Sequence, residues 1–408
     1  MDIPSHDKDT ELDQNRYWWT KLVPLCLLYL AFGSVNRSIA PLVTPIIRDL
    51  DLSYTQMGLI LGSWQLTYIL VAIIAGRILD KWGVRKSLMA GTLTIALSEV
   101  LRFFPKGFEG MLGCLALFGA GGSMISVGVP KAVSLWFKGK RRGTALGICM
   151  ANSWVGAILT LALTNSLVMP LAAYSWRTTF LLYGLLTGAI ALVWWFLSKE
   201  ASLPKSDEDA GIMQVFARLI GIRSVQIAFI TGLLTFVVIH GFSQWLPKIL
   251  EMKGLSPASA SLSASVPYAA GVLSLLLIPS LIPPRRRGHY VAISSLFNIL
   301  ALVLVSTFSG IAQFIGLILY GFITISIVPM LTLFLMDIPE VGSRYMGSAG
   351  GMFFCISEIG GFTGPSIMGF LVDATGTFYA SVFLLAAVCV AISILGLFMK
   401  VRAVEKNE

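Results

Sequence analysis

Residues 76–86 read Gly-Arg-Ile-Leu-Asp-Lys-Trp-Gly-Val-Arg-Lys and separate two long apolar stretches of the chain. Four basic residues and one aspartate gather here, as in the short charged loops that join neighbouring membrane-spanning helices. Gly76 allows a neighbouring helix to approach closely, and Asp80 can cap the next helix or pair with an arginine. Arg85 and Lys86 favour a cytoplasmic position for this loop.

The composition of the whole chain is that of an integral membrane protein. Of its 408 residues, 56% are hydrophobic and 12% are charged, and the mean hydropathy is +0.80, whereas soluble proteins carry about 25% charged residues. Apolar stretches of ~20 residues recur, each long enough to cross ~30 Å of hydrocarbon. Because backbone groups in lipid must be paired internally, we predict an all-α membrane protein.

Several functional classes are disfavoured by what the sequence lacks. It has neither the P-loop lysine motif of ATP-driven pumps nor a catalytic constellation, so we expect no enzyme and no cofactor. The net charge of +9 does not require nucleic acid as a partner, because the basic residues lie in short loops. The five cysteines all fall in apolar stretches without a CxxC pattern, so neither a metal site nor a disulfide is expected: Cys26, Cys114, Cys149, Cys355 and Cys389.

The apolar stretches predict twelve membrane-spanning helices. Their expected ranges are 22–46, 56–79, 87–104, 111–136, 144–170, 177–198, 224–247, 258–282, 290–308, 311–336, 346–370 and 378–399. An even number of spans places both termini on one side. Of the 30 Lys and Arg residues, 23 then lie on that side, six lie on the other, and Arg37 lies within a span, which predicts cytoplasmic termini. We expect a plasma-membrane location, in a bacterium the inner membrane.

A polar interval divides the chain into two similar parts. Residues 199–223 are predicted to be a cytoplasmic linker between six-helix bundles at 22–198 and 224–399, with cytoplasmic tails at 1–21 and 400–408. The first tail lacks the pattern of a cleaved signal peptide. A shift of 203 positions lays the loop at 76–86 near the basic run at 283–289. Such internal symmetry suggests two bundles that rock about a central site.

The chain resembles the major facilitator superfamily. The motif at 76–86 is similar to the loop that this family places between its helices 2 and 3. Residues 130–147 resemble the junction of helices 4 and 5, Trp176-Arg-Thr-Thr-Phe180 the start of helix 6, and Gly241–Pro247 the end of helix 7. The resemblance implies a monomeric transporter with alternating access to a site between two bundles, in which Asp80 and Arg85 take part in gating.

Three ionisable residues within the spans are candidates for that site, because charge inside a membrane is costly. The guanidinium of Arg37 suits a carboxylate, although a structural pairing or an outer-interface position also fits. The shift of 203 places His240 on Arg37, which suggests an anion-attracting cavity or, alternatively, an ordinary packing histidine. Glu358 is a candidate proton carrier, coupling or gating residue, or part of a structural ion pair.

Other polar residues in the spans are weaker candidates. Glu99 and Arg102 are spaced to satisfy each other, so we interpret them as structural, and snorkelling is sufficient to explain Lys131. Four further residues lie at depths that suit a substrate cavity: Tyr68, Asn152, Gln244 and Tyr268.

The segment from Asn36 to Gly76 is similar to the anion:cation symporter branch of the family, which carries organic acids with protons or sodium. In that branch an aspartate normally precedes the basic residue of helix 1, whereas Asn36 stands here. Residues 130–147 look more like the nitrate and cyanate porters. The helix 2 and helix 8 arginines of nitrate porters are missing, as is the helix 5 Gly-Pro motif of drug antiporters.

These observations favour a transporter of a small organic anion, a monocarboxylate or similar organic acid, with a proton as the candidate coupling ion. The resemblance leaves open an alternative, in which Glu358 and an aromatic cavity accept an organic cation or a neutral solute. A receptor on the same scaffold would need a larger soluble part. Neither the substrate nor the direction of transport follows from the sequence.

Overall fold

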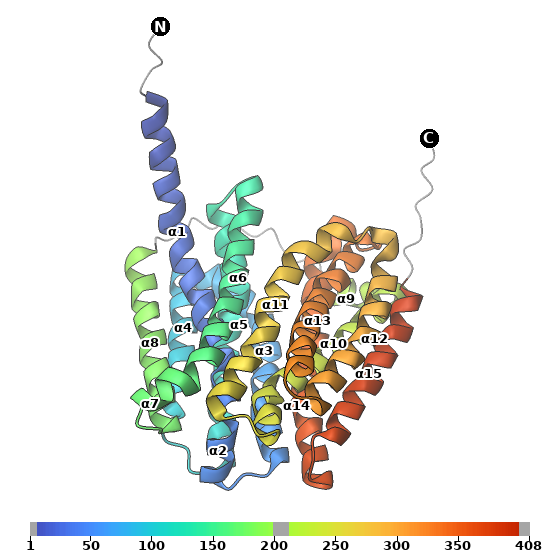
Figure 1. Cartoon of the computed structure of the whole chain (residues 1–408). Coiled ribbons are helices and arrows are strands. Elements are labelled where there is room, and N and C mark those ends of the chain that lie inside the picture. Colours follow the sequence, from blue (N-terminus) through green and yellow to red (C-terminus); the bar gives the residue numbers. More distant parts are fainter. Residues whose placement is uncertain (1–5, 199–211, 400–408) are drawn as a thin grey trace.

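The computed structural model describes residues 6–198 and 212–399, and the regular structure in these ranges is helical (Figure 1). The first half contains α1 (His6–Arg37), η1 (Ala40–Leu42), α2 (Val43–Leu50), α3 (Tyr54–Trp82), α4 (Val84–Leu101), α5 (Phe108–Trp136), α6 (Lys140–Leu163), η2 (Thr164–Val168), α7 (Met169–Leu171) and α8 (Trp176–Leu197). The second half contains α9 (Ile212–Ile220), α10 (Arg223–Met252), α11 (Pro257–Leu281), η3 (Pro284–Arg286), α12 (Arg287–Thr307), α13 (Ile311–Asp337), α14 (Gly342–Thr375) and α15 (Tyr379–Phe398).

Each predicted span corresponds to a helical segment of this fold. Ten segments of the described chain are long and apolar enough to cross a membrane, and α3, which bends near Ala72, makes eleven. The twelfth is α4, with 18 residues that include Arg85, Lys86 and Glu99. The protein is therefore an all-α, multi-pass membrane protein.

The first span differs from the continuous helix expected at 22–46. Helix α1 begins already at His6, because residues 6–21 contain no glycine or proline to stop it. It ends at Arg37, and the chain continues through η1 and α2. Pro41 favours the interruption, since proline has no backbone N–H to donate and is best accommodated in the first turn of a new helix, although α1, α5 and α10 each continue through a proline.

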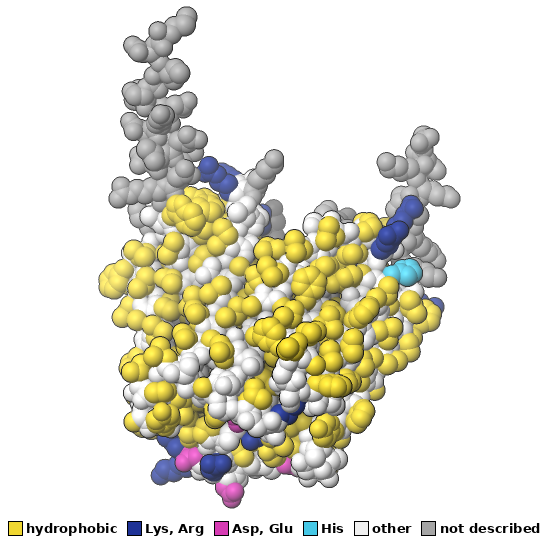
Figure 2. Space-filling view, viewed as in Figure 1, with side chains coloured by type: hydrophobic (Ala, Val, Ile, Leu, Met, Phe, Trp, Pro, Cys, Tyr) yellow, Lys and Arg dark blue, Asp and Glu magenta, His cyan; other side chains and the backbone are white. Residues whose placement is uncertain are grey.

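The two ends of the bundle are distinct. Helix α1 begins and α15 ends at the same end, at the top of Figure 1, which we call the terminal end. Elements α2 and α7 lie at the opposite end, which we call the distal end. Figure 2 shows apolar side chains over the flank of the bundle and charged side chains mainly near its two ends, as expected for a protein that spans a bilayer.

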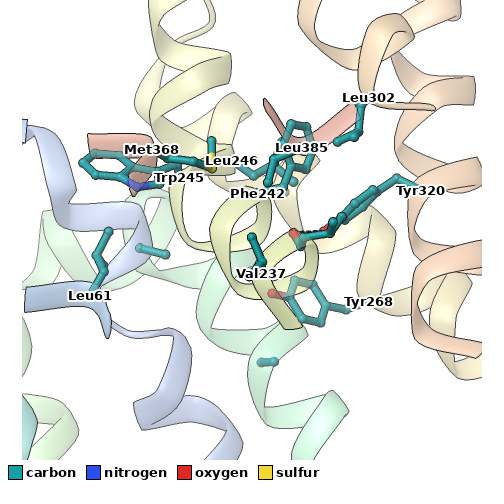
Figure 3. Packing of buried hydrophobic residues seen from close by; sticks show 14 of the residues in the cluster. Leu61, Val237, Phe242, Trp245, Leu246, Tyr268, Leu302, Tyr320, Met368 and Leu385 are labelled. Carbon is teal, nitrogen blue, oxygen red and sulfur yellow. Dashed lines mark hydrogen bonds between the residues drawn. The ribbon is translucent and has the colours of Figure 1, made fainter. Parts of the chain in front are cut away.

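The two halves pack tightly against each other toward the distal end. Helix α3 lies against α14 so closely that a Cβ on Gly58 would stand 2.5 Å from the carbonyl oxygen of Pro365. A Cβ on Gly369 would stand 2.1 Å from that of Tyr54. One buried apolar cluster includes residues of both halves, and Figure 3 shows Leu61 facing the neighbouring pair of second-half residues Trp245 and Met368.

Toward the terminal end, the same helices offer open surfaces. A Cβ on Gly76 of α3 or on Gly147 of α6 would meet no described atom within 4 Å. The same holds for Gly347 and Gly351 of α14. The glycines of α3 and α14 are thus in close contact near the distal end and free near the terminal end. The structure is a conformation closed distally.

Candidate functional site

Arg37 lies where the first span is interrupted, between α1 and η1. Its side chain is buried, with 6% relative exposure, and its guanidinium carbon stands 5.1 Å from the ring centre of Tyr268 on α11. The ring of Trp154 on α6 also packs against Tyr268, with 5.8 Å between the two ring centres. Arg37 of the first half is therefore in contact with the second half through an aromatic ring.

A buried ion pair holds the chain directly after Arg37. Arg102 Nη1 lies 2.8 Å from Glu99 Oε1, and both side chains are fully buried. The hydroxyl of Ser38 donates to Glu99 Oε1 at 2.7 Å and accepts from Arg102 Nη1 at 3.0 Å. Ser98 accepts a further hydrogen bond from Arg102 at 3.1 Å. This cluster anchors the break in the first span and thereby the base of the Arg37 side chain.

His240 and Glu358 lie together in the second half. His240 Nε2 on α10 stands 4.0 Å from Glu358 Oε2 on α14, and both residues are buried. On the other side of the imidazole, Gln65 Nε2 of α3 lies 3.4 Å from His240 Nδ1. Arg37 is close enough to act electrostatically on both His240 and Glu358. A cation, a carboxylate and a titratable ring thus share one buried region between the halves.

The remaining predicted cavity residues occupy different surroundings. Tyr68 bonds to Ser126 through its hydroxyl at 2.8 Å and contacts Trp64, which in turn packs against His240 at 5.9 Å. Asn152 donates to the carbonyl of Ile148 within its own helix, at 2.9 Å. Contacts therefore connect Tyr68 to His240, while the described hydrogen bond of Asn152 is local.

Several buried polar atoms near this region lack a hydrogen-bond partner among residues 6–198 and 212–399. They are Arg37 Nη1, Trp64 Nε1, Gln65 Oε1, Gln244 Oε1, the Tyr268 hydroxyl and Glu358 Oε2. Because leaving a buried polar group unsatisfied costs ~1–3 kcal/mol, such atoms mark where a bound molecule or water would be stabilised. They comprise one donor from a cation, one indole donor, one hydroxyl that can donate or accept, and three acceptor oxygens.

The charged segment at 76–86, expected to be a loop, is helical on both sides of Gly83: its first residues end α3 and its last residues begin α4, and its described contacts lie within the first half. Asp80 forms an ion pair with Lys131 of α5, so Lys131 has a partner beyond the snorkelling that sequence suggested. Arg85 donates to the carbonyl of Trp195 at 2.6 Å and lies 4.2 Å from its ring centre. Trp194 Nε1 donates back to the Arg85 carbonyl at 3.0 Å. In this conformation, Asp80 and Arg85 connect α3 and α4 to α5 and α8.

Sequence reasoning did not identify Gln65 or Ser38 as site residues. The only signal for Gln65 was its position three residues before Tyr68, which places both on one helical face. Ser38 gave no signal, because its role depends on Glu99 and Arg102, which are distant in sequence. Glu99 and Arg102 themselves do satisfy each other, as the spacing suggested.

Two helical halves that enclose a buried polar site and are closed at one end define a membrane transporter of the alternating-access class. Comparison with known proteins gives the family. A family model described as Major Facilitator Superfamily matches residues 25–365. The chain belongs to the Major Facilitator Superfamily.

Known relatives cover nearly the whole chain. The hexuronate transporter of Bacillus subtilis (strain 168) is 27% identical over 395 residues, 90% of this chain and 91% of the relative. The probable sulfoacetate transporter SauU of Cupriavidus necator is 25% identical, covering 87% of each chain. The D-galactonate transporter of Escherichia coli O6:H1 is 23% identical, covering 95% of each.

Solved structures confirm the fold at low sequence identity. The nucleoside transporter NupG superposes with a TM-score of 0.79 at 17% identity, over 93% of this chain and 99% of that one. A D-xylose–proton symporter superposes with a TM-score of 0.78 at 15% identity, over 94% and 97%. These matches establish the architecture alone.

Proposed function

We propose that this protein is a secondary transporter of a small organic anion, and that Arg37 binds the carboxylate of its substrate. The proposal rests on one observation. Arg37 is buried between the halves, and its Nη1 has no hydrogen-bond partner in the described chain. A guanidinium stays charged when buried and presents a fork of donors that matches a carboxylate. An anion would supply the missing acceptor.

The relatives favour a hydroxylated acid over a simple monocarboxylate. Three of them are named as transporters of hexuronate, D-galactonate and tartrate, which carry hydroxyl groups beside a carboxylate, whereas one is named for sulfoacetate, which carries a carboxylate and no hydroxyl. Gln244 suits such a substrate, because its Oε1 is buried without a partner and can accept from a hydroxyl. The substrate class proposed here is accordingly a polyhydroxylated carboxylate.

Coupling to protons is assigned to His240 and Glu358. Asn36 replaces the acidic residue that precedes the basic residue of helix 1 in the anion:cation symporter branch, so a titratable group must come from elsewhere. Glu358 Oε2 is buried beside the imidazole and has no partner of hydrogen-bond length in the described chain. A proton on either group would change the charge of the cavity that holds Arg37.

The arrangement of aromatic rings argues against the cation-transport alternative. Tyr268, one of the aromatic residues expected to line the cavity, already lies under the guanidinium of Arg37 at 5.1 Å. A second cation at this ring would be repelled by Arg37. Glu358 also lies within the electrostatic influence of Arg37, which reduces its attraction for an external cation.

The distribution of basic residues indicates the orientation of the protein in the membrane, and the contacts of Asp80 and Arg85 indicate their role in gating. We assign the terminal end to the cytoplasm of a plasma membrane, because the span prediction puts 23 of the 30 Lys and Arg residues on the side of the two termini. The distally closed conformation would then be open to the cytoplasm. Asp80 and Arg85 would support gating by keeping the first half rigid while the halves move.

The experiment that tests this function is thermal unfolding of the purified protein with D-galacturonate, D-galactonate, choline and xylose. A ligand that binds only the folded state raises the melting temperature by mass action. We expect the two acids to stabilise the wild type and to lose this effect in Arg37→Ala. Arg48→Ala is the matched control, because Arg48 is exposed and follows Arg37 in the same span.

Stabilisation by choline alone would overturn the anion proposal. Equal stabilisation by acids in wild type and Arg37→Ala would overturn the role of Arg37 while keeping the substrate class. Uptake of labelled D-galacturonate into vesicles, with and without a pH gradient, then measures whether transport is coupled to protons.

A further inference from the structure

We propose that Gln65 is a positioning residue that makes contact between the two halves depend on the protonation of His240. This inference deepens the proposed function, since it concerns how the site that includes His240 and Glu358 is linked to closure at the distal end.

Gln65 is the first-half member of a three-residue chain across the interface. It is fully buried on α3, and its Nε2 lies 3.4 Å from His240 Nδ1 on α10. His240 Nε2 stands 4.0 Å from Glu358 Oε2 on α14. The amide nitrogen can only donate, so it requires an unprotonated Nδ1. Gln65 thus selects the neutral tautomer whose Nε2–H is directed toward Glu358.

Glu358 opposes a rotation of the Gln65 amide. A Cβ on Gly361 would stand 2.7 Å from Glu358 Oε2 and 3.2 Å from Gln65 Nε2, so both polar atoms border the same small space. Rotation of the amide would exchange its nitrogen for its oxygen and bring that oxygen beside the carboxylate. The present orientation, with nitrogen toward His240 and Glu358, is therefore favoured.

Protonation of His240 at Nδ1 turns this contact into one between two donors. The hydrogen bond from Gln65 is then lost, and the amide cannot rotate without approaching the carboxylate. The charged groups that act on His240 are Arg37 and Glu358. Tyr68 and Cys355 act in turn on or with Glu358, and Tyr268 and Tyr320 with Arg37. Arg37 adds a like charge, whereas Glu358 is the acidic member of the set.

The position of Gln65 along α3 connects this contact to closure. Below it, toward the distal end, α3 and α14 touch at Gly58 and Pro365 and at Gly62 and Phe362. Above it, Gly76 meets no described atom. Gln65 therefore lies where the close approach of the halves ends, and loss of its hydrogen bond weakens the distal closure at the centre of the membrane.

The test measures the conformation directly and needs no substrate. Spin labels at Glu109 and Thr377, exposed residues near the distal end of each half, report the distance between the halves in lipid nanodiscs frozen at a series of pH values. The five native cysteines are replaced by alanine in every sample. We expect the wild type to shift toward a distally open population as the pH falls.

Two substitutions of Gln65 make opposite predictions. Gln65→Met keeps the length but cannot hydrogen-bond, so the pH-dependent shift should be lost. Gln65→Glu supplies an acceptor that binds the imidazolium across the interface, so protonation should strengthen closure and the shift should reverse, toward the distally closed population as the pH falls. Gln313→Leu is the matched control: Gln313 is also buried, but lies on α13 near Val305, and its substitution should leave the midpoint unchanged.

A wild type without a pH-dependent shift overturns the proposal, as does persistence of the shift in Gln65→Met or a shift toward the distally open population in Gln65→Glu. Failure of the carboxylate-binding function would appear separately, as absence of stabilisation by D-galacturonate and D-galactonate. The two results are independent, because the distance measurement contains no substrate.

Discussion

The carboxylate of Asp373 accepts hydrogen bonds from both the backbone N–H and the hydroxyl of Thr55, at 2.7 and 2.6 Å. Thr55 lies in the first turn of α3 in the first half, whereas Asp373 lies near the end of α14 in the second. The backbone N–H of Tyr54 donates to the same carboxylate at 2.9 Å. One half thus caps a helix of the other, and a negative charge at a helix start is stabilising.

Replacing Asp373 by asparagine should weaken distal closure. The amide keeps one acceptor but loses the charge that strengthens these bonds. Since Asp373 is exposed and screened, we expect the ratio of closed to open molecules to fall roughly fivefold, about 1 kcal/mol. Spin labels near the distal end measure this ratio. Asp51→Asn, an exposed carboxylate at the same end, serves as the control and should leave it unchanged.

A methyl group at Gly369 should separate the halves at the distal end. The new Cβ would stand 2.1 Å from the Tyr54 carbonyl, and overpacking of this kind costs ~1–3 kcal/mol. Gly369→Ala should therefore increase labelling of engineered cysteines in the distal interface. Gly76→Ala has open space instead and should not change that labelling. Equal behaviour of the two variants would mean that α3 and α14 do not approach as described.

Glu99 should be among the most sensitive positions for stability. Glu99→Leu would leave Arg102 charged and unpaired in the interior, a change that typically costs ~3–5 kcal/mol. Asp49→Ala breaks the exposed pair with Arg177 and should cost at most ~1 kcal/mol. Melting temperatures in the same detergent compare the two. A smaller loss for Glu99→Leu than for Asp49→Ala would contradict the anchoring role of the buried pair.

Ser38 should affect binding more than stability. Ser38→Ala removes the hydroxyl that links the chain after Arg37 to Glu99 and Arg102, at a stability cost near ~1 kcal/mol. Because Arg37 is then less firmly positioned, the KM for D-galacturonate uptake should rise with little change in the maximal rate. Ser63→Ala is the control, since the Ser63 hydroxyl is buried but bonds only to Ile60 of its own helix in the described chain.

Arginine at position 37 should not be replaceable by lysine. Arg37→Lys keeps a positive charge but loses the paired donors that recognise both carboxylate oxygens. We expect the affinity for D-galacturonate to fall ~10-fold, about 1.4 kcal/mol, in competition binding. An affinity equal to that of the wild type would show that charge alone is recognised.

The composition and the charged loop at 76–86 were sufficient to predict the class of fold. A continuous apolar stretch of this length can pair its own backbone groups in a bilayer only as a helix, so the all-α architecture follows from length and hydropathy. The described helices match all twelve predicted spans, although their bounds differ by several residues. The break after Arg37 was not predicted, because Pro41 alone does not decide between a kink and an interruption.

The sequence by itself determined which residues are expensive to place in a membrane, and so it singled out Arg37, His240 and Glu358. It could not determine their neighbours. The contact of Gln65 with His240 and the pairing of Asp80 with Lys131 join residues far apart in the chain. Hydropathy is a property of each segment, whereas such contacts depend on how the segments pack, and only the tertiary structure decides that.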